Sequence, residues 1–323
     1  KRAGSATHRR TNPAHMIAPK PRNTPSIKLL LIATRPAFLN VTAVAVLLGY
    51  ASAVHSGHIM DYPSAALTLI FALVAHAGAN VINDYYDTLS GCDNAESERI
   101  APFTGGSQLI QKGRLSASAT RLFGYSLLLS VVPVGVYLTY RSGLGLLFIG
   151  GLGIFIAWAY SAPPFKLQSR GLGEWAITLS WLLVVIGTDW VQSHRLSFTP
   201  MAVGLSFALS VAIVLDINQC PGIRGDQIAR KYALIVRLGT LNARYGYMAL
   251  TALCAAWLST MVILGYLPTP ALYGLIPLLL QVQACMILWR DAERPHLLAP
   301  AIERTIVSTL AHGLCVALAL LVK

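Results

Sequence analysis

The sequence predicts an all-α integral membrane protein in which nine transmembrane helices surround a central cavity that opens toward the cytoplasmic side. Hydrophobic residues make up 55% of the 323 residues and charged residues only 12%, whereas a soluble domain carries about 25% charged residues. Nine apolar runs approach the roughly 20 residues with which an α-helix crosses a bilayer. Lys and Arg also gather in alternate connections between these runs. Little soluble mass is left, and no connection is long enough to form a second domain.

The apolar runs follow one another along the chain with short connections. They lie near 36–55, 64–82, 119–140, 143–160, 172–191, 199–217, 243–267, 270–289 and 302–322. Before them, the polar, basic and proline-containing segment 1–28 is predicted to be a disordered tail. It has no apolar core ahead of a cleavage site, which argues against a secretory signal. Residues 29–323 are predicted to form one membrane domain. The five cysteines show no CxxC spacing, and we expect them to be reduced and structural.

The basic residues predict the orientation of the helices. Of the 25 Lys and Arg residues, 22 fall in the N-terminal segment and the even-numbered connections. The positive-inside rule places these segments in the cytoplasm and the C-terminus outside, in a cell (inner) membrane. One missed helix would destroy this alternation, so the charges also favour nine helices. The net charge of +12 is therefore a topology signal that can also attract anionic headgroups; it does not indicate nucleic acid.

The acidic residues point to a site on the same side. Eleven of the 13 Asp and Glu residues lie on the predicted cytoplasmic side. They are prominent in connections 80–115 and 214–238, which both follow an apolar run and both mix carboxylates with Lys and Arg. We interpret these two connections as the two halves of one site.

The first half begins with a polar stripe at the end of an apolar helix. Asn80, Asn83, Asp84 and Asp87 are spaced i, i+3, i+4, i+7, so they share one helix face. Carboxylate and amide oxygens are ligands for Mg²⁺, and closely packed carboxylates favour a screening cation. Asp93 follows after a turn at residue 91. The alternative is a solvated helix end whose acids offset nearby basic residues.

The same connection and the fourth connection add phosphate-binding candidates. Gly105-Gly106-Ser107 supplies backbone N–H groups, and Lys112 and Arg114 supply cationic donors for phosphate oxygens. In the fourth connection, Tyr160 and Lys166 flank a Pro-Pro pair. Gly-Gly loops are common, however, and Tyr160 and Lys166 are equally explained as an interfacial anchor and a topology charge.

The second half lies in residues 215–239. Its candidates for metal or diphosphate binding are Asp216, Asn218 and Asp226. Its positive charges are Arg224, Arg230, Lys231 and Arg237. The topology rule alone explains the basic residues, but it does not explain two polar side chains at positions 216 and 218, at the edge of an apolar run.

These residues, in this order, resemble the UbiA superfamily of membrane prenyltransferases over almost the whole chain after about residue 30. The resemblance is carried by "TRPAFL" (34–39), "NDYYDTLSGCD" (83–93), "YSAPPFKLQSRGLGE" (160–174) and "VRLG" (236–239). With "GGSQLIQKGRLS" behind it, the first acidic motif is most similar to that of the menaquinone branch, which prenylates 1,4-dihydroxy-2-naphthoate.

The resemblance implies Mg²⁺-dependent transfer of a polyprenyl group from its diphosphate to an aromatic acceptor. The implied metal ligands are Asn83, Asp84, Asp87, Asp93, Asn218 and Asp226. The implied catalytic residues are Asn83, Asp84, Asp87, Asp226, Lys166 and Tyr160, and the diphosphate ligands are Lys112, Arg114, Arg224 and Lys231. Aromatic candidates for stabilising an allylic cation are Tyr85, Tyr86, Trp158 and Tyr160.

The second acidic motif departs from the family pattern. Gly222 stands where the family has the first of two aspartates, Arg230 replaces the usual Gly and Ala233 the usual Thr. The loss of a carboxylate puts the second metal position in doubt. A non-catalytic isoprenoid-binding or transport protein therefore stays open, as does an enzyme for another acceptor, such as 4-hydroxybenzoate, homogentisate or a sugar phosphate.

Overall fold

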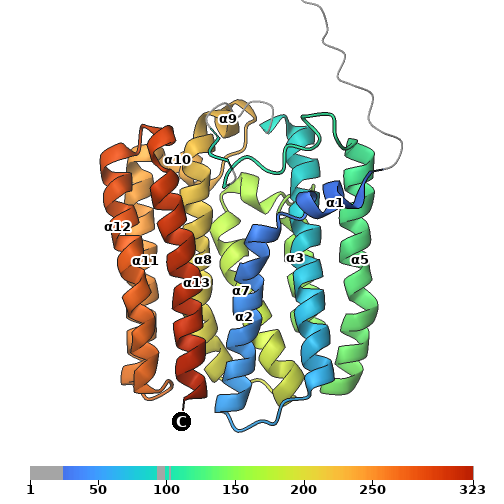
Figure 1. Ribbon diagram of the computed structural model, residues 1–323, viewed down its shortest axis with the longest axis vertical. Helices are drawn as coiled ribbons and strands as arrows, with labels where there is room; N and C mark the ends of the chain where they lie inside the picture. The colour runs from blue at the N-terminus through green and yellow to red at the C-terminus, as the bar shows by residue number, and fades with distance from the viewer. Residues whose placement is uncertain (1–24, 93–98, 102, 323) are drawn as a thin grey trace, which may run out of the picture.

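The computed structural model describes residues 25–92, 99–101 and 103–322, and in this part of the chain all regular structure is helical. Long helices run side by side along the vertical axis of Figure 1 and form one bundle. Asp93 lies outside the described residues. The first helix begins at Ile27, slightly before the boundary predicted for the tail.

The helices follow the order of the predicted apolar runs. They are α1 (Ile27–Ala33), α2 (Pro36–His55), α3 (Tyr62–Ser90), α5 (Ala117–Ser142), α6 (Gly145–Ala159), α7 (Gly173–Ser193), α8 (Thr199–Gln219), α9 (Ile223–Ile228), α10 (Leu234–Leu238), α11 (Thr240–Ile263), α12 (Leu275–Asp291) and α13 (Ala299–Leu321). Short 3₁₀ turns lie between them: η1 (Leu167–Arg170), η2 (Cys220–Gly222), η3 (Thr269–Gly274) and η4 (Pro295–Leu297).

The chain is an integral membrane protein. Eight of the described helical segments are long and apolar enough to cross a bilayer. Helix α6 is apolar but has only 15 residues, which corresponds to about 22 Å of helix against a hydrocarbon core of about 30 Å. Nine spans therefore stay a prediction that depends on α6.

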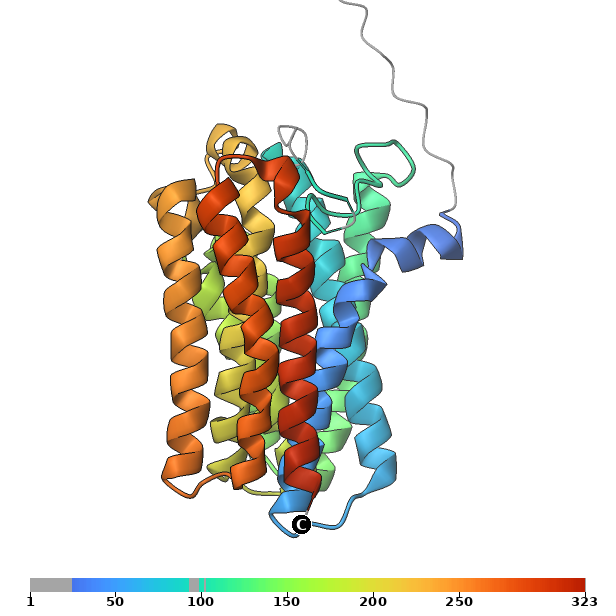
Figure 2. The same cartoon turned by 60° about the vertical axis from the view of Figure 1, so that its left-hand side comes forward.

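The two ends of the bundle differ. Helices α1, α9 and α10 lie at one end, and α13 ends at the other, in both Figure 1 and Figure 2. The first acidic motif lies at the C-terminal end of α3, and the second lies at the end of α8 and in α9, so both are at the α9 end of the bundle. The local sequence fits these boundaries, since prolines occupy the first turn of α2, α3 and α8, where an amide hydrogen is dispensable.

Small residues bring neighbouring helices into close contact. A Cβ atom on Gly49 of α2 would lie 2.5 Å from Cβ of Thr188 on α7. The largest buried cluster joins α2, α7, α8, α11 and α13 and includes Leu48, Phe207 and Leu258. Many other large apolar side chains, such as Leu129 and Phe148, are exposed on the outside, as expected for a surface that faces lipid. All five cysteines are free thiols.

Candidate active site

A cavity of about 680 Å³ lies among α2, α3, α5, α6, α7 and α8. Its walls are mainly apolar. Its charged lining residues are Arg35 at the start of α2, Asp87 near the end of α3, Asp226 in α9 and Lys231 just before α10. The volume is in the range of pockets that bind small molecules. A space with an apolar body and a polar end suits an amphiphilic ligand.

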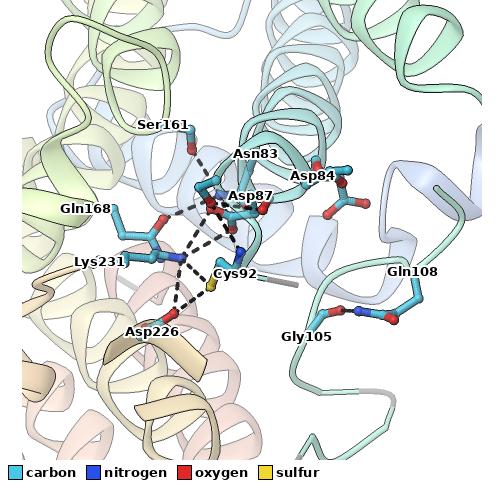
Figure 3. A network of polar contacts seen from close by, with 12 residues as sticks. Asn83, Asp84, Asp87, Cys92, Gly105, Gln108, Ser161, Gln168, Asp226 and Lys231 are labelled. Carbon is cyan, nitrogen blue, oxygen red and sulfur yellow. Dashed lines mark hydrogen bonds and ion pairs between the residues drawn. The ribbon is translucent and has the colours of Figure 1, made fainter. Parts of the chain in front are cut away.

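Helix α3 brings part of its polar stripe to this cavity. Asn80, Asn83 and Asp87 all line it. The amide of Asn83 donates to Asp87 Oδ2 at 3.0 Å and to Ser161 Oγ at 2.9 Å. These side chains point toward one another in Figure 3. The α3 stripe is therefore held in place by the loop that follows α6.

Lys231 joins the two acidic segments. Its ammonium lies 3.3 Å from Asp87 Oδ2 and 3.8 Å from Asp226 Oδ1, although these residues are far apart in sequence. The side chain of Lys231 is only 7% exposed. Burial disfavours its charge, but the Asp87 and Asp226 carboxylates outweigh that effect and raise the pKa of Lys231 above its ordinary value. The ammonium is therefore a fixed positive charge at the polar end of the cavity.

Cys92 completes this cluster. Its thiol donates to Asp226 Oδ1 at 2.7 Å and lies 4.0 Å from Lys231 Nζ. Burial raises the pKa of the Cys92 thiol well above its ordinary value, so the group stays protonated and acts as a donor.

Asp84 has a different environment from its neighbours on α3. It is buried, but it is not part of the cavity lining. Its carboxylate pairs with Arg35 at the start of α2 and accepts from the backbone N–H of Ser107 at 3.1 Å. Figure 3 shows Asp84 directed away from the cluster around Lys231. In this conformation Asp84 connects the start of α2 and the Gly105-Gly106 loop to α3.

The second acidic segment contributes Asn218, Gly222 and Asp226 to the cavity lining. The Asn218 Oδ1 atom is buried and has no hydrogen-bond partner within the described part of the chain. Such an atom is costly unless a ligand satisfies it. Asp216 instead lies against Glu174 of α7 and lines a separate cavity of about 460 Å³.

The residues present fit a magnesium ion. Asp87, Asp226, Asn83 and Asn218 offer only oxygen ligands from their side-chain carbonyl and carboxylate groups, and Lys231 already lies between two of the carboxylates. Among the described residues, no three His, Cys, Asp or Glu side chains form a metal cluster. Mg²⁺ does not need one, because it commonly uses one or two carboxylates together with waters and substrate phosphates.

The remaining predicted catalytic and diphosphate-binding residues divide into two groups. Tyr160 lines the cavity. The exposed ones, which are not part of the cavity lining, are Lys112, Arg114, Lys166 and Arg224. The assignments of these four residues stay predictions, and the described geometry does not support them.

Sequence reasoning also missed several residues of the site. Arg35, Cys92 and Gln168 line the cavity, and Ser161 orients Asn83. The segments "TRPAFL" and "YSAPPFKLQSRGLGE", which carry the resemblance, contain Arg35, Ser161 and Gln168. Membership in these family segments could have pointed to the site, but the sequence analysis assigned no role to Arg35 or Gln168.

Comparisons with known proteins agree with this architecture. The chain belongs to the UbiA prenyltransferase family, whose sequence model matches residues 41–301. It is therefore a membrane prenyltransferase. The 1,4-dihydroxy-2-naphthoate octaprenyltransferase of Escherichia coli is 29% identical over 294 residues, which cover 87% of this chain and 91% of that protein. The 2-carboxy-1,4-naphthoquinone phytyltransferase of Synechocystis is 27% identical, covering 75% of this chain and 80% of that protein.

A solved structure also matches. It is a UbiA homolog from Archaeoglobus fulgidus bound to DMAPP and Mg²⁺, with a TM-score of 0.59 and 17% sequence identity. The match covers 89% of this chain and 98% of that one. At this identity the likeness shows the fold alone.

Proposed function

We propose that this enzyme transfers a polyprenyl group from polyprenyl diphosphate to 1,4-dihydroxy-2-naphthoate in a Mg²⁺-dependent reaction. The observation that carries the proposal is the meeting of Asn83 and Asp87 with Asp226 and Lys231 at the polar end of a long apolar cavity. A polyprenyl diphosphate has the matching shape, with an anionic head and an apolar tail.

The polar end would hold the diphosphate and its metal. Asn83, Asp87, Asn218 and Asp226 would provide the metal ligands, and a bound Mg²⁺ supplies charge neutralisation for the diphosphate leaving group. Asp84 and Asp93 remain further candidates from the motif. Lys231 and Arg35 line the same cavity and add positive charge near the departing oxygen. Such fixed charges stabilise the transition state more than they would in water.

The apolar walls serve the reactive intermediate. When the bond between the prenyl carbon and the diphosphate oxygen breaks, both electrons leave with the diphosphate and an allylic cation remains. Walls from α5 and α6, including Val134 and Ile149, would keep water from this cation while the aromatic ring forms the new carbon–carbon bond. The ring carboxylate then leaves as CO₂. Tyr160 lines the cavity and can turn its electron-rich ring toward the cation.

The choice of acceptor rests on the relatives. Both curated relatives described above carry a naphthalene-ring substrate in their names, and they are similar to this chain over most of its length. The distribution of Lys and Arg supports a cytoplasmic position for the N-terminus and the polar end, with residues 29–323 as the transferase domain in the inner membrane.

The test is an assay of labelled polyprenyl transfer in membranes that contain the protein. With Mg²⁺ and 1,4-dihydroxy-2-naphthoate we expect a prenylated naphthoquinol, and with EDTA we expect none. 4-Hydroxybenzoate is assayed in parallel. A product only with 4-hydroxybenzoate would overturn the acceptor, and folded protein that transfers to no acceptor would overturn the reaction in favour of a carrier.

A further inference from the structure

The α3 stripe extends deeper into the cavity than the acidic motif. His76 precedes Asn80, Asn83 and Asp87 by four, seven and eleven residues, so all four share one helix face, and all four line the cavity. Seven residues of α-helix correspond to about 10 Å. His76 therefore lies about 10 Å below Asn83, beyond the place where a diphosphate would bind.

The imidazole ring is fixed on one side and open on the other. His76 Nδ1 lies 2.8 Å from Thr42 Oγ1 of α2. The ring packs edge-on against Trp181 of α7, with centroids 5.1 Å apart and an interplanar angle of 88°. Within the described part of the chain, His76 Nε2 has no hydrogen-bond partner. One ring nitrogen is thus directed by α2, while the other is available to a ligand.

A second unsatisfied group lies next to it. The indole N–H of Trp181 is buried and also lacks a partner among the described residues. Polar groups this deep in a membrane protein are costly when unpaired and commonly belong to a functional site. Thr42, His76 and Trp181, which together line the cavity, make a polar wall contributed by three helices.

The wall formed by α6 has a different character. Along α6, Gly150, Gly151 and Gly153 line the cavity, and a Cβ added at any of them would meet no atom within 4 Å. This side offers apolar groups and open space, which suit a polyprenyl tail. A tail has no group that could pair with His76. The polar wall is therefore available to the other substrate.

From this division we propose that Thr42, His76 and Trp181 form the subsite for the aromatic acceptor, in which His76 Nε2 hydrogen-bonds a ring hydroxyl. The chemistry fits a phenol in particular, because a hydroxyl both donates and accepts and so pairs with either imidazole tautomer. Trp181 offers an aromatic surface beside it. The inference rests on the proposed transferase function and deepens it by assigning the acceptor side of the same cavity.

The test separates the two substrates kinetically. In lipid nanodiscs, His76→Leu should raise the KM for 1,4-dihydroxy-2-naphthoate about tenfold, as expected for loss of one hydrogen bond. The KM for polyprenyl diphosphate should change less than about twofold. His76→Gln keeps a hydrogen-bonding group and should recover most of the acceptor affinity. Thr68→Val is the matched control, because Thr68 lines the cavity on α3 but bonds its hydroxyl within the helix.

A binding measurement distinguishes failure of this inference from failure of the proposed function. The acceptor is titrated without polyprenyl diphosphate, using tryptophan fluorescence, and 2-naphthoate serves as the analogue without hydroxyls. His76→Leu should weaken the binding of 1,4-dihydroxy-2-naphthoate and leave the binding of 2-naphthoate unchanged. If the wild-type enzyme is active, but His76→Leu weakens the binding of both ligands equally or of neither ligand, the subsite assignment is overturned. Hydroxyl-selective binding that depends on His76, in a protein that transfers nothing, would overturn the transferase function and retain the subsite.

Discussion

Lys231→Met tests whether the ammonium holds the two acidic segments together in the absence of metal. Methionine has nearly the same length but no charge. Because Lys231 lies 3.3 Å from Asp87 Oδ2 and 3.8 Å from Asp226 Oδ1, its removal leaves two carboxylates at the polar end of the cavity without the cation between them.

The magnitude follows from these distances. At an effective dielectric constant of about 20, each ion pair contributes about 4–5 kcal/mol of Coulomb energy. Desolvation of a buried lysine offsets part of this energy, and the loss of one partner from a buried pair costs about 3–5 kcal/mol. We therefore expect Lys231→Met to lower the free energy of unfolding by about 3 kcal/mol in EDTA.

Mg²⁺ should restore much of this loss, because a ligand that binds only the folded state stabilises it by about 2.7 kcal/mol at 100 times its Kd. The freed carboxylates should also bind the ion more tightly than in the wild type. The assay is thermal unfolding in nanodiscs, followed by tryptophan fluorescence, in EDTA and across a Mg²⁺ titration. Lys166→Met removes an exposed lysine and should leave the midpoint unchanged.

The pH dependence gives an independent check. The folded-state pKa of Lys231 is raised, so its stabilisation is fully present below its unfolded pKa of about 10.4 and is lost only as the pH rises through the higher folded value. The stabilisation contributed by the lysine charge itself should therefore not fall between about pH 6 and 9. Equal midpoints in EDTA, or identical Mg²⁺ responses, would refute the bridging role.

Three further substitutions test the metal site and the packing. Asp87→Asn should lower prenyl transfer by at least about 100-fold, because it weakens the metal site, while size-exclusion behaviour is retained; near-wild-type activity would exclude Asp87 as a ligand. Gly222→Asp restores the family's carboxylate at a residue with ordinary helical φ and should lower the Mg²⁺ concentration for half-maximal activity, whereas an unchanged or higher requirement would speak against a second metal position there. Gly49→Val should lower the free energy of unfolding by about 1–3 kcal/mol through the clash with Thr188. Its unfolding midpoint should be lower than that of Gly135→Ala, whose added Cβ meets no atom within 4 Å. Equal midpoints would contradict the close approach of α2 and α7.

Asp84 illustrates the limit of pattern reasoning within one helix. The spacing of residues 80, 83, 84 and 87 predicts a shared face, but that face is broad. Asp84 lies at its edge, where Arg35 and the Ser107 amide reach it, and Asp87 faces the cavity. Periodicity gives the angle around the helix axis, but not which neighbouring element covers each part of the face.

The basic residues show that the sequence also does not predict which side chains of distant segments reach the cavity. The sequence offered Lys112, Arg114, Arg224 and Lys231 as diphosphate ligands. Only Lys231 lies at the cavity. The charge of each lysine is evident from the sequence, but its reach depends on how the α9–α10 connection folds back over the bundle end.

The sequence by itself determined the membrane class, the helix order and the meeting of two acidic segments, because hydropathy and charge report directly on which solvent each segment can face. It also indicated the family through local motifs. The tertiary structure alone decided which polar groups oppose one another: Lys231 between Asp87 and Asp226, Asp84 on Arg35, and His76 between Thr42 and Trp181. These contacts join residues distant in the chain, and their distances depend on the packing of whole helices rather than on any local pattern.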